Sequence, residues 1–292
     1  KELIGDGNLV SIYDSKKDVM NFNGGFSRGG GENLKFAGNY YPSQKENNLE
    51  VDAEVQDFRL EFFEPFIKGN FENLKGVASA ELKIKGTPEA PLLTGILKAK
   101  VDNIHVNYLG TNYHFDGDIV LEPSSFDFAN LVILDVNNNK ANIVNGKIFH
   151  NNYKNFQLDF DVNVNKFLCL NTTEKDHSIY YGKVFTTGIF NVFGFLEHVH
   201  LSAAVKTDKA KNVLGKNEYS QLFIPLSGSE EVGENSFISF VKKDTSLKPE
   251  KYKVNTSGFT MDFKLQPTMD AQVQLIFDEK VGDIIKANGT GD

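Results

Sequence analysis

One eight-residue pattern recurs three times in this chain. It begins at Asn48, at Asn155 and at Gly258, and the spacings are 155 − 48 = 107 and 258 − 155 = 103 residues. Each copy alternates apolar and polar residues and carries Asp at the same step. Strict alternation predicts a strand with one apolar and one polar face. A strand unit repeated at a nearly fixed interval favours an elongated repeat architecture over a compact enzyme.

Most of the remaining chain has the same rhythm. Strand-like runs, the first at Leu34–Tyr41, recur about every ten residues with turn signals between them, which is typical of an all-β protein. The dipeptides Asn23-Gly24 and Asn145-Gly146 predict hairpin turns, because both residue types tolerate positive φ. The sequence therefore predicts a fold built almost entirely from antiparallel strands.

Three segments depart from this rhythm. Phe58–Ile67 ends in an apolar cluster around Pro65, and we expect a short helix or a plug that folds over apolar surface. Thr207–Tyr219 and Lys242–Lys251 are polar and lysine-rich, and we expect both to be loops.

The apolar face of such a sheet needs a covering. An ordinary sandwich or barrel would close over a dry core. A sheet that keeps adding similar strands would instead form a long curved, antiparallel-rich sheet around a groove with a hydrophobic interior. We expect the second arrangement, and the first stays open as its alternative. The residues predicted to line the groove are Val51, Leu82, Ile84, Phe156, Leu158, Phe160, Val162, Val199, Leu201, Val205, Met261, Phe263, Leu265, Val273, Leu275 and Phe277.

Composition and charge exclude several functions. The net charge of −8 argues against binding nucleic acid, which needs clustered Lys and Arg, and against electrostatic docking on anionic headgroups. Contact with neutral acyl chains is unaffected. The single cysteine, Cys169, lies in an apolar run and is expected to be a buried, inert thiol. No apolar run approaches the roughly 20 residues that span a bilayer, and no signal peptide is recognisable.

The domain organisation follows from the repeats. We expect residues 1–292 to form a single elongated segment of a larger protein, with weak repeats at about 1–75, 76–190 and 191–292. Any membrane anchor would lie in a part that this chain does not include.

The sequence offers no convincing catalytic or metal site. His198 and His200 lie on one face of a predicted strand, but Val199 and Leu201 define the buried face, so both imidazoles should point to solvent. His105, His114, His150 and His177 are scattered. The segment 175–178 resembles a polar turn more than a hydrolase site, and the glycines at 29–31 lack the Lys-Ser/Thr ending of a phosphate loop. We therefore expect no enzyme activity, no cofactor and no metal.

Several segments, read in order, resemble the TamB family (the translocation and assembly module, within the AsmA-like or bridge-like lipid-transfer superfamily). The resemblance covers most of the chain, from about Leu49 to the end. The segments that carry it are Ser79–Thr87 with Pro91–Leu97, Tyr108–Asp116, Phe167–Asp176 before Tyr180-Tyr181-Gly182, and Val281–Lys286 with Gly289-Thr290-Gly291; the last resembles the family's C-terminal domain.

The resemblance implies a fold and a location. TamB-like proteins are envelope proteins of Gram-negative-type bacteria, anchored in the inner membrane at the N-terminus, with a C-terminal region that partners an Omp85-family barrel (TamA-like) in the outer membrane. Their fold is the β-taco, a curved sheet with a hydrophobic groove. They are implicated in phospholipid transport to the outer membrane and in the assembly of outer-membrane proteins.

Four functions remain open at this point. The first is a non-enzymatic groove that carries phospholipid acyl chains between inner and outer membrane. The second is a periplasmic assembly factor for outer-membrane β-barrel or secreted proteins, which holds nascent strands by β-augmentation. The others are a structural β-repeat or adhesin, and an enzyme. We expect the first.

Overall fold

The computed structural model describes residues 5–28, 31–69, 71–176, 180–225, 259–278 and 283–287. Within these ranges, 76% of the residues lie in strands, and hydrogen bonds group them into one 17-stranded, mostly antiparallel sheet. The predicted all-β, antiparallel-rich fold is therefore confirmed.

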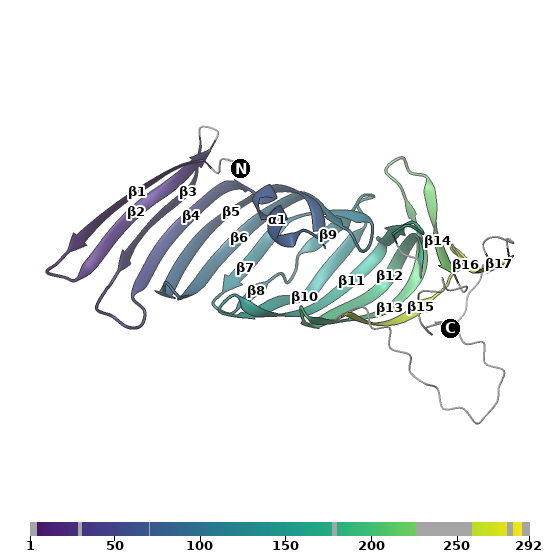
Figure 1. Ribbon diagram of the computed structural model, residues 1–292. Coiled ribbons are helices and arrows are strands. Elements are labelled where there is room, and N and C mark those ends of the chain that lie inside the picture. The colour runs from purple at the N-terminus through teal and green to yellow at the C-terminus, as the bar shows by residue number, and fades with distance from the viewer. Residues whose placement is uncertain are drawn as a thin grey trace, which may run out of the picture. The chain divides into compact units, whose positions relative to one another are not determined.

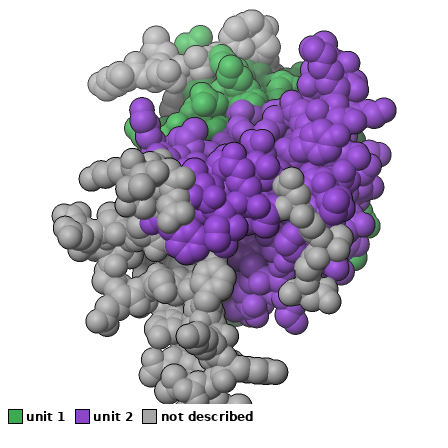
Figure 2. All heavy atoms as spheres, turned by 90° about the vertical axis from the view of Figure 1, so that its right-hand side faces the viewer, with its two compact units in different colours: residues 1–105, 113–133, 143–159 green, residues 106–112, 134–142, 160–292 purple. Residues whose placement is uncertain are grey.

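The chain divides into two compact units (Figure 2). Unit 1 contains residues 1–105, 113–133 and 143–159, and unit 2 contains residues 106–112, 134–142 and 160–292. Several strands are shared, because the boundary falls inside them. The three weak repeats expected at 1–75, 76–190 and 191–292 stay a prediction.

Unit 1 begins with five strands joined in chain order. Each pairs antiparallel with the next, and they lie side by side in Figure 1. They are β1 (Asp6–Asp14), β2 (Val19–Arg28), β3 (Gly31–Tyr40), β4 (Leu49–Arg59) and β5 (Phe71–Thr87). The unit continues with most of β6 (Ala90–Val106) and β7 (Thr111–Glu122), with β8 (Ser125–Asp127), and with parts of β9 (Val132–Asp135), β10 (Lys140–Asn151) and β11 (Lys154–Thr172).

A short helical segment covers part of unit 1. The 3-10 helix η1 (Leu60–Phe63) runs into the single-turn helix α1 (Glu64–Ile67). Leu60 is buried against Leu74, Ala78 and Val101, and Ile67 packs against the same cluster. The prediction of a short helix or plug folded over apolar surface at Phe58–Ile67 is confirmed for residues 60–67, whereas Phe58 and Arg59 belong to β4.

Unit 2 contains two parallel strand pairs. Its strands, besides parts of those above, are β12 (Tyr181–Phe195), β13 (His198–Lys211), β14 (Asn217–Pro225), β15 (Phe259–Gln266), β16 (Ala271–Asp278) and β17 (Asp283–Ala287). β12 pairs antiparallel with β13, whereas β13 with β15 and β14 with β16 are parallel.

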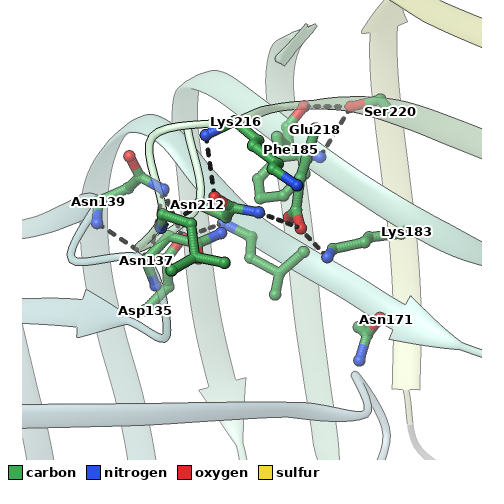
Figure 3. A network of polar contacts seen from close by, with 12 residues as sticks. Asp135, Asn137, Asn139, Asn171, Lys183, Phe185, Asn212, Lys216, Glu218 and Ser220 are labelled. Atoms are coloured by element: carbon green, nitrogen blue, oxygen red, sulfur yellow. Dashed lines mark hydrogen bonds and ion pairs between the residues drawn. The ribbon is translucent and has the colours of Figure 1, made fainter. Parts of the chain in front are cut away.

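Ser220 stabilises the point where β12 changes partner. Residues 185–195 of β12 pair with β13, and residues 181–183 pair with β14. At the change, Ser220 Oγ donates to Asp208 O at 2.6 Å. It also accepts from Phe185 N–H at 2.9 Å (Figure 3). Phe185 is fully buried beside Leu168 and Ala210. One buried hydroxyl thus forms hydrogen bonds with backbone groups that are left unpaired where β12 changes partner.

Two of the turn predictions were wrong. Asn23-Gly24 lies inside β2 and Asn145-Gly146 inside β10. Gly24 serves close packing, since a Cβ there would lie 2.7 Å from the Phe36 ring and would clash with the Asn8 carbonyl. Asn145 donates a side-chain hydrogen bond to Asp159. Glycine inside a strand often marks such a close approach rather than a turn.

The loop predicted at Thr207–Tyr219 was also wrong for most of its length. It is the β13–β14 hairpin, in which Lys209 pairs with Tyr219 and Lys211 with Asn217. Its polar residues lie in paired strands, and Thr207 and Ala210 within it are 2% and 1% exposed. The loop predicted at Lys242–Lys251 lies outside the described residues.

Candidate functional site

The strands β2 to β5 align apolar residues in rows on one side of the sheet. One row runs Phe22, Gly38, Val51, Ile84. Directly paired residues project from the same side, so each row is a line of side chains across four strands. The other rows are Met20, Tyr40, Leu49, Gly86; Gly24, Phe36, Ala53, Leu82; and Phe26, Leu34, Val55, Ala80. We call these four rows the apolar face of β2–β5.

Glycine and phenylalanine complement each other on this face. A Cβ at Gly38 would lie 3.0 Å from Phe22 Cζ, so the Phe22 ring extends over the neighbouring glycine. Phe36 extends in the same way over Gly24, and the Phe22 and Phe36 ring centroids are 6.4 Å apart. Aromatic side chains thus cover backbone that the glycines would leave bare.

The opposite side of the same strands is polar. Glu50, Asp52 and Glu54 of β4 alternate with the apolar set and are exposed. Lys85 of β5 forms an ion pair with Glu50 at 3.4 Å, with both side chains largely in solvent. The sheet is therefore amphipathic, as the alternation predicted.

Burial along the apolar side of unit 1 changes from strand to strand. Leu9 of β1 is 66% exposed and Phe26 of β2 is 43% exposed. Val51 and Ile84 are half-buried. In contrast, Ala99 of β6 is 3% exposed within a cluster that contains Leu82 and Leu93. Apolar surface is therefore accessible at β1–β4, and it is closed by packed side chains further along the unit.

Phe156 and Leu158, the predicted lining residues at the start of β11, are half-buried in unit 1. Phe156 contacts the ring of His150, with centroids 6.0 Å apart. His150 is 6% exposed, its Nδ1 accepts from Tyr153 N–H, and desolvation lowers its pKa. This buried imidazole was not singled out from the sequence, where it is one isolated His.

In unit 2 the predicted lining residues of β13 and β15 share one side. The parallel register places Leu201 beside Met261, Ala203 beside Phe263, and Val205 beside Leu265. Val199 belongs to the same set, and Val205 is 5% exposed whereas Phe263 is 50% exposed. Phe160 and Val162 of β11 are half-buried.

The last predicted lining strand, β16, has a different burial pattern. Gln274 and Ile276 are its buried residues besides Ala271, whereas Val273, Leu275 and Phe277 are half-buried. Leu222 lies beside Val273, and Ile224 beside Leu275, in the parallel pairing with β14. Both sides of β16 are thus partly covered.

His198, His200 and Cys169 have different surroundings in the fold. His198 is exposed, and His200 packs on Phe193 with centroids 4.7 Å apart, on the side opposite Val199 and Leu201. Burial raises the pKa of the Cys169 thiol to about 12, and its Sγ lies 2.9 Å from Thr186 Oγ1. The raised pKa agrees with the inert thiol that the sequence predicts, although Cys169 as a whole residue is half-buried rather than buried.

Among the described residues, no three His, Cys, Asp or Glu side chains come together as a metal site, and no helix has the length and apolarity to cross a membrane. His177 and the glycines at 29–30 lie outside the described residues.

Sequence reasoning missed β2, the first strand of the face, whereas β3 corresponds to the predicted run Leu34–Tyr41. The signal was present, because Met20 and Phe22 alternate with Asn21 and Asn23. The Asn-Gly pair was given the meaning of a turn, and this masked the alternation around it.

Comparison with known proteins identifies the family. No curated protein and no solved structure matched the chain. A family model described as the TamB C-terminal domain matches residues 130–292, more than half of the chain. The matched range contains strands β10 to β17. It therefore covers all of unit 2 after residue 134. The chain therefore belongs to the TamB family of cell-envelope proteins and contains its C-terminal domain.

Proposed function

We propose that this protein is a non-enzymatic carrier of phospholipid acyl chains between the inner and outer membranes, with the apolar side of its sheet as the carrying surface. The observation that carries the proposal is the apolar face of β2–β5, which is apolar along every row, half-buried and backed by a charged side. The predicted lining residues Val51, Leu82 and Ile84 belong to it.

The energetics favour such a surface. Each methylene of an acyl chain costs about 0.8 kcal/mol in water, so a chain of about fifteen methylenes costs roughly 12 kcal/mol. A face of Phe, Val, Leu and Ile removes part of this cost and leaves the headgroup in solvent. Rows of similar side chains offer many nearly equal positions, which suits movement better than one tight site.

The partially exposed face argues against a closed sandwich for β1–β4. In a dry core the facing side chains would be buried like Ala99 and Ile119, which are 3% and 7% exposed. Val51, Phe22 and Phe36 are half-buried instead. An acyl chain is a suitable cover, since it needs no hydrogen bonds from the protein.

The first test is chemical. The purified protein should carry phospholipid that mass spectrometry identifies after organic extraction, and it should shield a fluorescent fatty-acid probe from aqueous quencher. Absence of both bound lipid and probe protection would contradict the proposal.

A second test uses the lining residues of unit 2. Phe160→Asp and Leu275→Arg should each reduce lipid transfer between vesicles while circular dichroism still reports a folded sheet. If transfer is unchanged in both folded variants, these residues do not contact the lipid.

A second candidate function, assembly of outer-membrane proteins, is favoured by β1. This strand pairs with β2, and it exposes apolar side chains on both sides, with Leu9 at 66%, Val10 at 55% and Ile12 at 66%. Natural sheets commonly protect their edge strands with Lys or Pro, and β1 has neither. An incoming strand of a nascent barrel could pair there by β-augmentation.

The two functions are separable. Val10→Lys should weaken capture of an unfolded barrel peptide and leave lipid transfer unchanged, because Val10 lies on the side opposite Phe22 and Phe36. If Val10→Lys instead leaves peptide capture unchanged and weakens lipid transfer, β1 does not have the assembly role. Under either function we propose an Omp85-family, TamA-like barrel as partner and a periplasmic position, with an inner-membrane anchor supplied by another part of the parent protein.

A further inference from the structure

The tip of the β13–β14 hairpin combines exposed apolar residues with cations. Val213 and Leu214 are 73% and 77% exposed, the two most exposed large apolar residues among those the structure describes. Lys211 and Lys216 flank them and are also exposed. The hairpin projects beyond the neighbouring strands of unit 2 in Figure 1. Two apolar side chains held in water at a projecting turn are costly unless something receives them.

The tip is ordered by its own hydrogen bonds. Asn212 Oδ1 accepts from Leu214 N–H and from Lys216 N–H, each at 3.0 Å (Figure 3). Asn212 N–H donates to Lys216 O, and Gly215 N–H donates to Asn212 O. Gly215 has φ +75°, a conformation that favours glycine. The turn therefore presents Val213 and Leu214 in a fixed, outward geometry.

Near the tip, the acidic side chains have partners, whereas two lysines form no ion pair within the part of the chain that the structure describes. The Glu218 carboxylate is paired with Lys183 at 2.7 Å, and Asp208 accepts from the Thr187 hydroxyl at 2.9 Å. Lys209 is paired with Asp270 at 2.9 Å. Among the described residues, Lys211 and Lys216 have no recorded ion pair, so the available charge at the tip is positive although the whole chain carries −8.

Tyr219 adds an interfacial residue below the cations. It is 53% exposed, and Lys209 Nζ lies 5.7 Å from its ring centroid. Each tip residue is two positions from a flanking lysine, so the apolar side chains and the cations belong to the same short turn. Tyrosine and lysine are the residue types that accompany the insertion of apolar side chains at headgroup level.

We propose that the β13–β14 hairpin tip is a membrane-docking device, in which Val213 and Leu214 enter a phospholipid surface and Lys211 and Lys216 contact lipid phosphates. The contact is weak and reversible, since two small apolar side chains and two lysines supply it against the repulsion of the chain's net negative charge. It is independent of how the acyl chains travel along the sheet.

The chain contains no Trp, so Leu214→Trp introduces a single fluorescent probe. With vesicles of phosphatidylglycerol and phosphatidylcholine, its emission should shift to shorter wavelength and be quenched by brominated acyl chains. Leu196→Trp is the matched control. Leu196 is 54% exposed in the turn at the other end of β13, next to Glu197 rather than a lysine, and its emission should not change.

Charge and apolar contributions separate by vesicle composition. Lys211→Gln and Lys216→Gln should each weaken binding to the anionic vesicles about fivefold, from roughly 1 kcal/mol per basic residue near an anionic surface, with little effect on pure phosphatidylcholine. Leu214→Asp should weaken binding to both vesicle types more than tenfold. Thermal melting should be unchanged in all three variants, because the tip side chains bury little surface.

Three results would overturn the proposal. The first is an equal spectral response from Leu214→Trp and Leu196→Trp. The second is vesicle binding that survives Leu214→Asp. The third is a Leu214→Trp emission that no vesicle changes but that an outer-membrane protein extract shields from quenching. That result would indicate that the tip binds a protein.

Discussion

The proposed acyl-chain surface makes its sharpest prediction at Phe22. This residue lies on the apolar face of β2–β5, and the next residue of the strand, Asn23, is exposed on the other side. Phe22→Asp therefore places a carboxylate on the proposed path, while Asn23→Asp places the same group one residue away on the polar side. The pair separates the effect of position from the effect of added charge.

The magnitude follows from the contact that is lost. An acyl segment lying over Phe22 would bury three or four methylenes, about 3 kcal/mol at roughly 0.8 kcal/mol each. A carboxylate cannot replace this contact and must also lose water. If the lipid has to pass this row, Phe22→Asp should slow transfer about 100-fold, and Asn23→Asp should change it less than twofold.

The assay is transfer of a fluorescent phospholipid between donor and acceptor vesicles, with urea unfolding as the control for folding. Phe22 is only half-buried, so we expect its variant to lose about 1–2 kcal/mol of stability and remain folded. Phe22→Leu should transfer nearly as well as the unchanged protein. If Phe22→Asp is folded and transfers lipid at the original rate, or if both Asp variants fail equally, the apolar face is not the carrying surface.

Three further predictions concern the structure itself. Ser220→Ala should lower the free energy of unfolding by about 1–3 kcal/mol, because Phe185 N–H and Asp208 O lose their buried partner; in urea titrations Ser202→Ala, at a half-buried position, should change it by less than about 0.5 kcal/mol. His150 has a lowered pKa in the folded protein, so the unfolded chain takes up its proton first and stability should fall as pH drops below about 6.5. His150→Phe should flatten that part of the stability-versus-pH curve, and an unchanged curve in this variant would contradict the assignment. Cys169 should resist maleimide at pH 8 and react after unfolding, whereas Asn23→Cys in a Cys169→Ala background should react at once; rapid labelling of folded Cys169 would show that its thiol is not buried.

The alternation of apolar and polar residues was sufficient to predict the fold class. β4 has the pattern that its sequence indicates, with Val51 and Ala53 on one side and Asp52 and Glu54 on the other. The plug at Phe58–Ile67 was also predictable, because a dense apolar cluster with Pro65 breaks the strand rhythm. Both depend on local sequence, which periodicity reports directly.

Features that depend on distant partners were not predictable. The parallel register of Val205 with Leu265 brings together strands whose sequences do not specify a neighbour. Gly24 looked like a turn residue because its packing partner, Phe36, is on the next strand. The buried environment of His150 comes from Phe126, Tyr153 and Phe156, none of which is recognisable as its partner from spacing.

The contrast within unit 1 bears on the choice between a groove and a dry core. Both arrangements need the same alternating sequence, so alternation alone cannot separate them. Around β5 and β6 the helical plug and the packed side chains bury Ala78, Val101 and Ala99, which is how an ordinary core behaves. At β2–β4 the same alternating pattern leaves Phe26 exposed and Val51 half-buried. Since exposed apolar rows of this extent are expensive in water, selection for a closed core would have covered them as it covered β5 and β6. This exposure is what we expect of the surface that we propose accepts and releases an apolar ligand, so Phe22 rather than Ala99 is the residue at which to test the proposal.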